Sequence, residues 1–154
     1  MIVVSDTSPI NYLVLIGEIE LLPQLFGQVI IPQAVLVELQ KQGTPKTVKD
    51  WVNNYPDWLK VQKAAKIDQT ITLGAGEREA ISLAKEINAD LVLIDDRKAR
   101  KAAIERGLNV AGTINILESA SKRGLVDLSK AFQKLQQTNF RVASDLLAEI
   151  LNRN

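Results

Sequence analysis

The sequence predicts an α/β protein, a three-layer α/β/α sandwich around a central parallel sheet of four or five strands. Short apolar runs alternate along the chain with segments of helical periodicity, which is typical of parallel sheets. Some of these runs are apolar throughout, as expected of strands that helices cover on both faces. The length of 154 residues suits one domain. We expect that domain to span residues 1–154, with a helical C-terminal tail from about residue 127.

Five short runs are the expected strands. Ile2–Val4 and Val29–Ile31 are rich in β-branched residues, which favour strands. Leu91–Ile94 is the clearest buried strand, because four apolar residues follow one another without interruption. The two remaining expected strands are Trp58–Gln62 and Asn109–Ala111.

The ends of the helices follow from capping residues, prolines and glycines. Ser8 is a typical N-cap residue and Pro9 suits the first helical position, so the first helix is expected to begin there. Gly17 and Gly107 are each expected to end a helix. The expected helices are residues 9–16, 33–40, 46–54, 77–87, 98–106, 113–122, 129–137 and 144–152.

Composition excludes several classes of chemistry. The chain has no cysteine and no histidine, so disulfides, the usual zinc sites and a Ser-His-Asp triad are excluded. Any catalysis must use carboxylates, hydroxyls, basic side chains or a metal held by oxygen atoms, and such sites suit Mg²⁺ and Mn²⁺. The net charge of +1 indicates no class of partner. No apolar run is long enough to span a membrane and no signal peptide is visible, so we expect a cytoplasmic protein.

The acidic residues fall where a parallel sheet would gather them. Asp6 follows the first expected strand, and Asp95 and Asp96 follow the strand at 91–94. Ligands of such sheets bind beyond the carboxyl ends of the strands. Glu77 and Glu79 begin a helix, and Glu38 lies within another on which apolar residues occupy most sides. Taken singly, each acid also has a local explanation, because carboxylates often cap or flank helix N-termini.

Other motifs with similar residues do not fit. The segment Gly74-Ala75-Gly76 lacks the third glycine of a dinucleotide-binding fingerprint and follows no clear strand. No phosphate-binding loop of the G-x-x-x-x-G-K-[ST] type occurs. A phosphatase of the haloacid-dehalogenase type would need an aspartate two residues after Asp6, where the chain has Ser8.

Four segments together resemble the PIN domain family of metal-dependent nucleases. They occur in the family's order and spacing, and the likeness covers residues 2 to about 120. The closest likeness is to a prokaryotic branch related to VapC-type toxins and formerly described as a domain of unknown function. The four segments are VVSDTS at 3–8, IIPQAVLVEL at 30–39, GEREAI at 76–81 and LIDDRKAR at 93–100.

This resemblance implies a set of site residues. The matching catalytic acids are Asp6, Glu38, Glu77, Glu79 and Asp96. The implied metal ligands are Asp6, Asp96, Glu79, Glu77 and Asp95, with Thr7 and Ser8 as supporting hydroxyls. The third acid stays open, because alignment on Ala80 favours Glu79 whereas alignment on the Gly-Glu pair favours Glu77. The implied cofactor is Mg²⁺ or Mn²⁺.

The same resemblance implies a function. We expect a metal-dependent endoribonuclease that cleaves single-stranded RNA and serves as the toxin of a toxin–antitoxin pair. One alternative is a catalytically inactive PIN-like module that binds RNA or protein. Another is a phosphatase or phosphotransferase that uses Asp6 as its nucleophile.

Partners are suggested by two further patterns. Arg97, Arg100 and Lys101 share one face of the helix after the paired aspartates, where they are expected to bind RNA. The opposite face carries Ala99, Ala102 and Ala103, which are expected to be buried. The first helices have more apolar residues than one face needs, so with the family likeness we expect a homodimer and a cognate antitoxin. These apolar residues are Ile10, Tyr12, Leu13, Leu15, Leu21, Leu22, Leu25 and Phe26.

Overall fold

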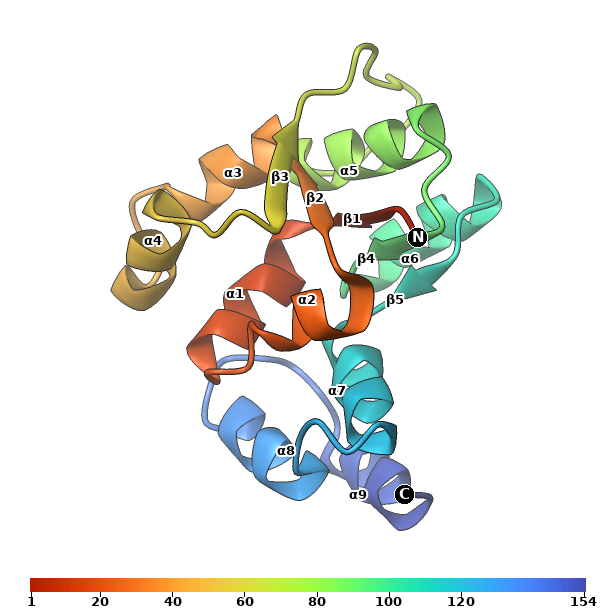
Figure 1. Ribbon diagram of the computed structural model, residues 1–154. Coiled ribbons are helices and arrows are strands. Elements are labelled where there is room, and N and C mark those ends of the chain that lie inside the picture. The colour runs from red at the N-terminus through yellow and green to blue at the C-terminus, as the bar shows by residue number, and fades with distance from the viewer.

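The computed structural model describes residues 1–154 and has one five-stranded sheet (Figure 1). All neighbouring strands are parallel, in the order β3-β2-β1-β4-β5. The expected α/β class and parallel sheet are therefore confirmed. The strands are β1 (Val3–Ser5), β2 (Val29–Pro32), β3 (Leu59–Gln62), β4 (Leu91–Leu93) and β5 (Val110–Ala111).

Nine helices connect and cover these strands. The expected helices all occur, with ends that differ by two residues or fewer from the sequence expectation. The first five are α1 (Thr7–Leu15), α2 (Leu21–Phe26), α3 (Gln33–Leu39), α4 (Lys46–Asn53) and α5 (Ala75–Glu86). The other four are α6 (Arg97–Glu105), α7 (Thr113–Lys122), α8 (Leu128–Gln136) and α9 (Ser144–Asn152). None of them has both the length and the apolar character needed to cross a bilayer.

Helices pack on both faces of the sheet because alternate strand residues point to opposite sides. Val4 and Val92 belong to a core shared with α5 and α6. Val3 and Leu93 belong to a larger core, which α1, α2, α7 and the C-terminal helices complete. The result is the expected three-layer arrangement (Figure 1).

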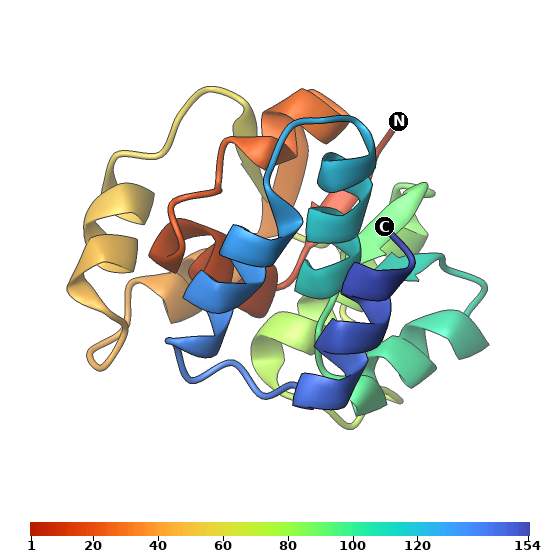
Figure 2. The same ribbon diagram turned by 90° about the horizontal axis from the view of Figure 1, so that it is seen from below.

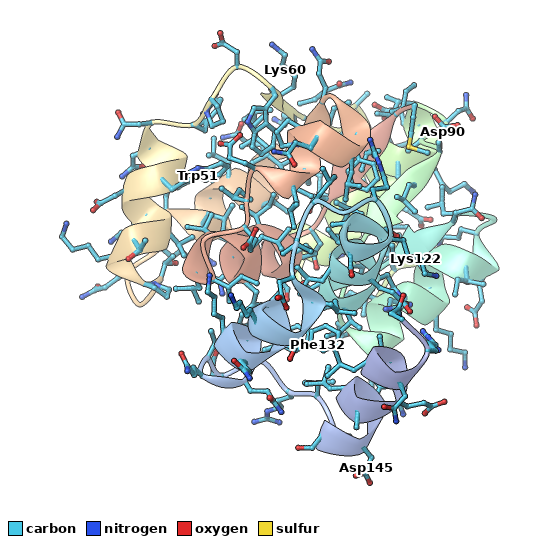
Figure 3. The ribbon with its side chains drawn as sticks, turned by 60° about the horizontal axis from the view of Figure 1, so that its bottom comes forward. Trp51, Lys60, Asp90, Lys122, Phe132 and Asp145 are labelled. Atoms are coloured by element: carbon cyan, nitrogen blue, oxygen red, sulfur yellow. The ribbon has the colours of Figure 1, made fainter.

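Helix α8 packs against α7, and α9 packs against α8. These helices lie at the lower end of the molecule in Figure 1, the end that faces the viewer in Figure 2. Phe132 of α8 is only 2% exposed, and with Leu128 and Leu147 it joins the larger core (Figure 3). Asp127 caps α8, because its side chain accepts a hydrogen bond from the backbone N–H of Lys130 at 3.0 Å. The tail therefore shares the core of the sheet.

Two helix starts differ from the expectation by two residues. Helix α1 begins at Thr7, and Asp6 rather than Ser8 holds the N-cap position. The reason is a contact with a neighbouring strand. The backbone N–H of Asp6 donates to the Leu93 carbonyl at 2.9 Å, which holds Asp6 in an extended conformation. Helix α5 begins at Ala75 with Gly74 at its N-cap, two residues before the expected start.

Helix α2 has only six residues, and the sequence pattern did not predict where it begins or ends. Its Pro23 is tolerated because the first turn of a helix leaves backbone N–H groups unpaired in any case. Of the eight apolar residues that suggested a dimer, Ile10, Leu13, Leu21 and Leu22 are buried in this chain. Tyr12, Leu15, Leu25 and Phe26 are partly buried against the same core. The homodimer stays a prediction.

Candidate active site

Asp6 lies at the carboxyl end of β1, near the middle of the sheet. Its side chain is 4% exposed and makes no capping hydrogen bond to α1. The oxygen Oδ1 is buried without any hydrogen-bond partner. Burying an acceptor oxygen without a donor costs free energy of folding. Asp6 therefore does not serve as a helix cap, and its free oxygen is available to a ligand.

The electrostatic environment of Asp6 supports this conclusion. The pKa of its carboxyl is raised from 3.8 to about 7. Burial is the largest cause, the charges of Glu77, Glu38 and Asp95 add to it, and the Thr7 amide opposes it. Crowded carboxylates repel one another unless a proton or a cation joins them. The anionic form of Asp6 is therefore destabilised in the absence of a proton or a cation.

Glu38 is brought to Asp6 by contacts from two other segments. Its Oε2 accepts a hydrogen bond from the hydroxyl of Thr7, the residue next to Asp6. Its Oε1 accepts one from the backbone N–H of Gly76 at 2.9 Å. Helix α3 alone does not place this carboxylate; the starts of α1 and α5 hold it.

Glu77 and Glu79 lie in different surroundings, although both are in α5. Glu77 is half-buried, and burial followed by the charge of Asp96 raises its pKa. The carboxylate of Glu79 accepts a hydrogen bond from the Ala34 N–H at 2.7 Å and another from the Ala64 N–H at 3.0 Å. The structure thus places Glu77 with Asp6 and uses Glu79 to tie α5 to α3 and to the loop after β3.

Asp95 and Asp96 also differ. Asp95 accepts hydrogen bonds from Ser8 Oγ at 2.6 Å, Thr113 N at 2.6 Å and Thr113 Oγ1 at 2.7 Å. It therefore links the end of β4 to the starts of α1 and α7. Asp96 is the N-cap of α6 and accepts from the backbone N–H of Ala99 at 3.0 Å.

A pocket of about 360 Å³ opens over Asp6. We call it the acidic pocket. It also contains Asn11 and Tyr12, which sequence reasoning did not assign to the site. Helical spacing could have indicated them. Asn11 lies four residues after Thr7, and Tyr12 lies four residues after Ser8, so each pair shares a face of α1. The lining residues are Asp6, Thr7, Ser8, Asn11, Tyr12, Glu38, Gly74 and Glu77.

None of the basic residues of α6 lines this pocket. Arg97 and Lys101 are exposed and Arg100 is half-buried. Of the three alanines expected to be buried, Ala99 and Ala103 are fully buried, whereas Ala102 is only half-buried. The orientation predicted for α6 is therefore largely confirmed.

Comparison with known proteins identifies the family. The family model of the PIN domain, DUF3368, matches residues 2–154. The chain belongs to the PIN domain family. A PilT N-terminus domain protein from the hyperthermophilic archaeon Sulfolobus solfataricus has a similar fold, with a TM-score of 0.58 and 24% sequence identity. The similarity covers 78% of this chain and 93% of that one. No functionally curated protein is similar enough in sequence to count as a relative.

PIN domains are typically nucleases and generally use divalent metal ions. The donor set of this PIN domain fits such an ion, because the acidic pocket offers only oxygen ligands and Asp6 Oδ1 is buried without a partner. No three acidic side chains are already arranged around one ion position. Asp6, Glu38 and Glu77 are nevertheless held around one pocket.

Proposed function

We propose that this PIN domain is a Mg²⁺- or Mn²⁺-dependent endoribonuclease that cleaves single-stranded RNA. The observation that carries the proposal is the buried oxygen Oδ1 of Asp6, which has no hydrogen-bond partner and lies in a pocket with two further acids. A structural acid would have its hydrogen bonds satisfied, as Glu79 does. A carboxylate oxygen that the fold buries without a hydrogen-bond donor is suited to bind a cation.

The residues of the pocket have distinct roles in this proposal. Asp6, Glu38 and Glu77 would hold the metal, with Asp95 and Asp96 adding negative charge nearby. The ion, when bound, would supply an activated water and neutralise charge on the scissile phosphate. Thr7 and Gly76 orient Glu38 through their hydrogen bonds. Ser8 and Thr113 hold Asp95 in the same way.

The biological role in this proposal is that of a toxin restrained by a cognate antitoxin. It is supported by the resemblance of the four sequence segments to the VapC-related branch of the family. Arg97, Arg100 and Lys101 would attract the RNA backbone toward the acids. A homodimer belongs to the same proposal and rests on the family likeness alone.

The test is cleavage of a labelled single-stranded RNA by the purified protein. We expect cleavage with Mn²⁺ or Mg²⁺, none after addition of a chelator, and a loss of at least about 100-fold in Asp6→Asn. The matched control is Asp57→Asn, because Asp57 is exposed and precedes β3, at the edge of the parallel sheet opposite to the one where Asp6 follows β1. Full cleavage by Asp6→Asn would overturn the proposal. RNA binding without any cleavage would favour the inactive module.

The toxin role is tested separately in cells. Induced expression of the wild-type protein should arrest growth, whereas Asp6→Asn at equal abundance should not. Growth arrest by both proteins would separate toxicity from the acidic pocket.

A further inference from the structure

A second depression lies beside the acidic pocket, between α6, the start of α7, the segment 140–143 and α9. It has a volume of about 910 Å³ and we call it the C-terminal groove. Figure 2 shows α6, α7 and α9 together at this end of the molecule. Apolar side chains contribute to its walls, among them Phe140, Ile104 and Leu146.

The charge of the C-terminal groove is strongly positive. Five basic residues line it, Arg97, Arg100, Lys101, Arg141 and Arg153, against the two acids Asp95 and Glu105. Arg153 is held by Glu118 in two hydrogen bonds. Lys101 lies 4.0 Å from Glu105.

The remaining three cations are unpaired. Arg97, Arg100 and Arg141 have no carboxylate within the 4.0 Å of an ion pair and donate no hydrogen bond from their side chains. Unpaired arginines gathered in one groove are the usual counterpart of phosphate groups.

An aromatic pair separates the C-terminal groove from the acidic pocket. The rings of Tyr12 and Phe140 meet edge to face, with centroids 4.9 Å apart and an interplanar angle of 83°. The hydroxyl of Tyr12 donates to Asn139 Oδ1 at 2.7 Å. Tyr12 lines the acidic pocket and Phe140 lines the groove, so the pair forms the ridge between them.

Asp95 provides a second link between the groove and the pocket. Asp95 lines the C-terminal groove, and its charge acts on both Asp6 and Tyr12. Gly112 keeps this border open, because a Cβ there would lie 2.8 Å from Asp95 Oδ1 and 2.8 Å from an Arg100 guanidinium nitrogen. The groove and the pocket are therefore neighbours, linked by the Tyr12–Phe140 contact and by the hydrogen bond from Ser8 to Asp95.

We propose that single-stranded RNA lies in the C-terminal groove and reaches the acidic pocket across the Tyr12–Phe140 ridge. Arg97, Arg100 and Arg141 bind its phosphates, and one unpaired base stacks against Phe140. This inference rests on the proposed ribonuclease function and gives it a substrate path and a preference for unpaired RNA. An aromatic side chain stacks only on a base that is not already paired within a duplex.

Charge complementarity favours RNA over a protein segment as the occupant. An apolar helix laid in the groove would have to cover three arginines that have no partner in this chain, and burying unpaired charge is costly. A polyanion instead pairs with them. RNA also connects the groove with the acids, where its phosphodiester would be cleaved.

The test is metal-free binding of a fluorescein-labelled RNA of about 12 nucleotides, which matches the span of single-strand binding folds. Binding is followed by fluorescence anisotropy between about 50 and 200 mM salt in chelator, so that no cleavage occurs. The triple variant R97A/R100A/R141A should weaken binding at least tenfold. It should also reduce the slope of log K against log salt by about 2, since three single-strand contacts account for roughly that much.

The matched control for the arginines is Arg123→Ala. Arg123 is exposed and follows the far end of α7, about 15 Å from Thr113 along the helix. Its loss should leave both affinity and salt slope unchanged. If the control and the triple variant lower the RNA affinity and the salt slope equally, RNA binds to basic residues anywhere on the surface, and the proposal is overturned.

Stacking is tested by Phe140→Leu, which keeps the apolar volume but removes the ring. We expect about tenfold weaker binding of the single strand and no change for a duplex of the same length. The matched control is Tyr55→Leu, because Tyr55 is an exposed aromatic residue that lines neither the groove nor the acidic pocket; its RNA affinity should equal that of the wild type. If Phe140→Leu does not fold, Arg141→Ala tests the same segment. It should weaken single-strand binding and lower the salt slope by about 0.7, and unchanged values would refute the path.

The outcomes separate this inference from the ribonuclease proposal. RNA bound through the groove but never cleaved in Mn²⁺ would refute the ribonuclease and leave the groove intact. Cleavage with unchanged affinity and salt slope in the triple variant would refute the groove, as would RNA that does not bind at all. An antitoxin that binds the groove while these variants keep full RNA affinity would assign the groove to protein.

Discussion

Gly76 touches Glu38 so closely that no side chain fits between them. A Cβ atom on Gly76 would lie 2.6 Å from Oε1 and 2.7 Å from Oε2 of Glu38. The same approach allows the Gly76 backbone N–H to donate to Oε1 at 2.9 Å. The first turn of α5 thereby fixes a carboxylate that α3 supplies.

Gly76→Ala should therefore displace Glu38 and reduce cleavage at least about tenfold. Alanine is the better helix former by about 1 kcal/mol, so a loss of stability must come from the contact with Glu38. Gly74→Ala is the matched control, because its Cβ would be 3.7 Å from Glu77 Oε1, an ordinary contact. RNA cleavage rates and thermal melting of both variants check the prediction. Full activity of Gly76→Ala would show that Glu38 need not be held in this place.

Asp6→Asn should stabilise the metal-free protein at neutral and alkaline pH. The folded pKa of about 7 exceeds the ordinary value of 3.8, so the folded state binds the proton more tightly than the unfolded state. The wild type accordingly loses stability as pH rises from about 4 to about 7. Asparagine carries no charge and avoids that loss.

The expected gain of Asp6→Asn is about 1–3 kcal/mol at pH 8, or roughly 3–10 °C in Tm. It should shrink toward zero at about pH 4, and Mn²⁺ should raise the Tm of the wild type only. Thermal melts in chelator across this pH range provide the measurement. A Tm of Asp6→Asn below that of the wild type at pH 8 would contradict the inference that burial and nearby acids destabilise charged Asp6.

Glu77 and Glu79 should respond in opposite ways to the same substitution. Glu79→Gln places an amide N–H₂ against backbone donors that need an acceptor, so stability should fall by about 1.5–3 kcal/mol. Glu77→Gln should leave stability unchanged or slightly higher, since burial and nearby acids already disfavour its charge. Cleavage should nevertheless fall at least about 100-fold. Denaturant unfolding and RNA cleavage measure the two effects, and the reverse pattern would make Glu79 the functional acid.

Acid should loosen the C-terminal end of α9. Hydrogen bonds from Arg153 and Asn154 lower the pKa of Glu118 from 4.5 to about 2. The stability from this contact is fully present above about pH 4.5 and is lost as pH falls toward 2. Glu118→Gln should lower Tm at pH 7 by about 2–6 °C, a difference that vanishes at low pH.

The control for this acid effect is Glu20→Gln, because Glu20 is exposed and makes no side-chain hydrogen bond to α2. Its Tm should match the wild type at every pH. A Glu118→Gln difference that persists near pH 2 would point to packing rather than to the ion pair.

Local sequence patterns determined the elements of this fold. All five strands lie where short apolar runs predicted them, and α7 and α9 have the expected ends at Thr113–Lys122 and Ser144–Asn152. Capping residues, glycines and strand propensity act within a few neighbouring positions. The order of strands and helices then made it predictable that Asp6 and Asp95 would lie at one edge of the sheet.

Only the tertiary structure decided between the paired acids. Glu77 and Glu79 are two residues apart, about 200° around α5, so they face opposite ways. Which face meets Asp6 depends on how α5 packs against β1, β2 and α3, and nothing near Glu77 in the sequence encodes that. The Tyr12–Phe140 contact likewise joins residues far apart in the chain. Burial and electrostatic coupling act between distant segments, so the sequence supplied the acids and the packing decided which of them share the pocket.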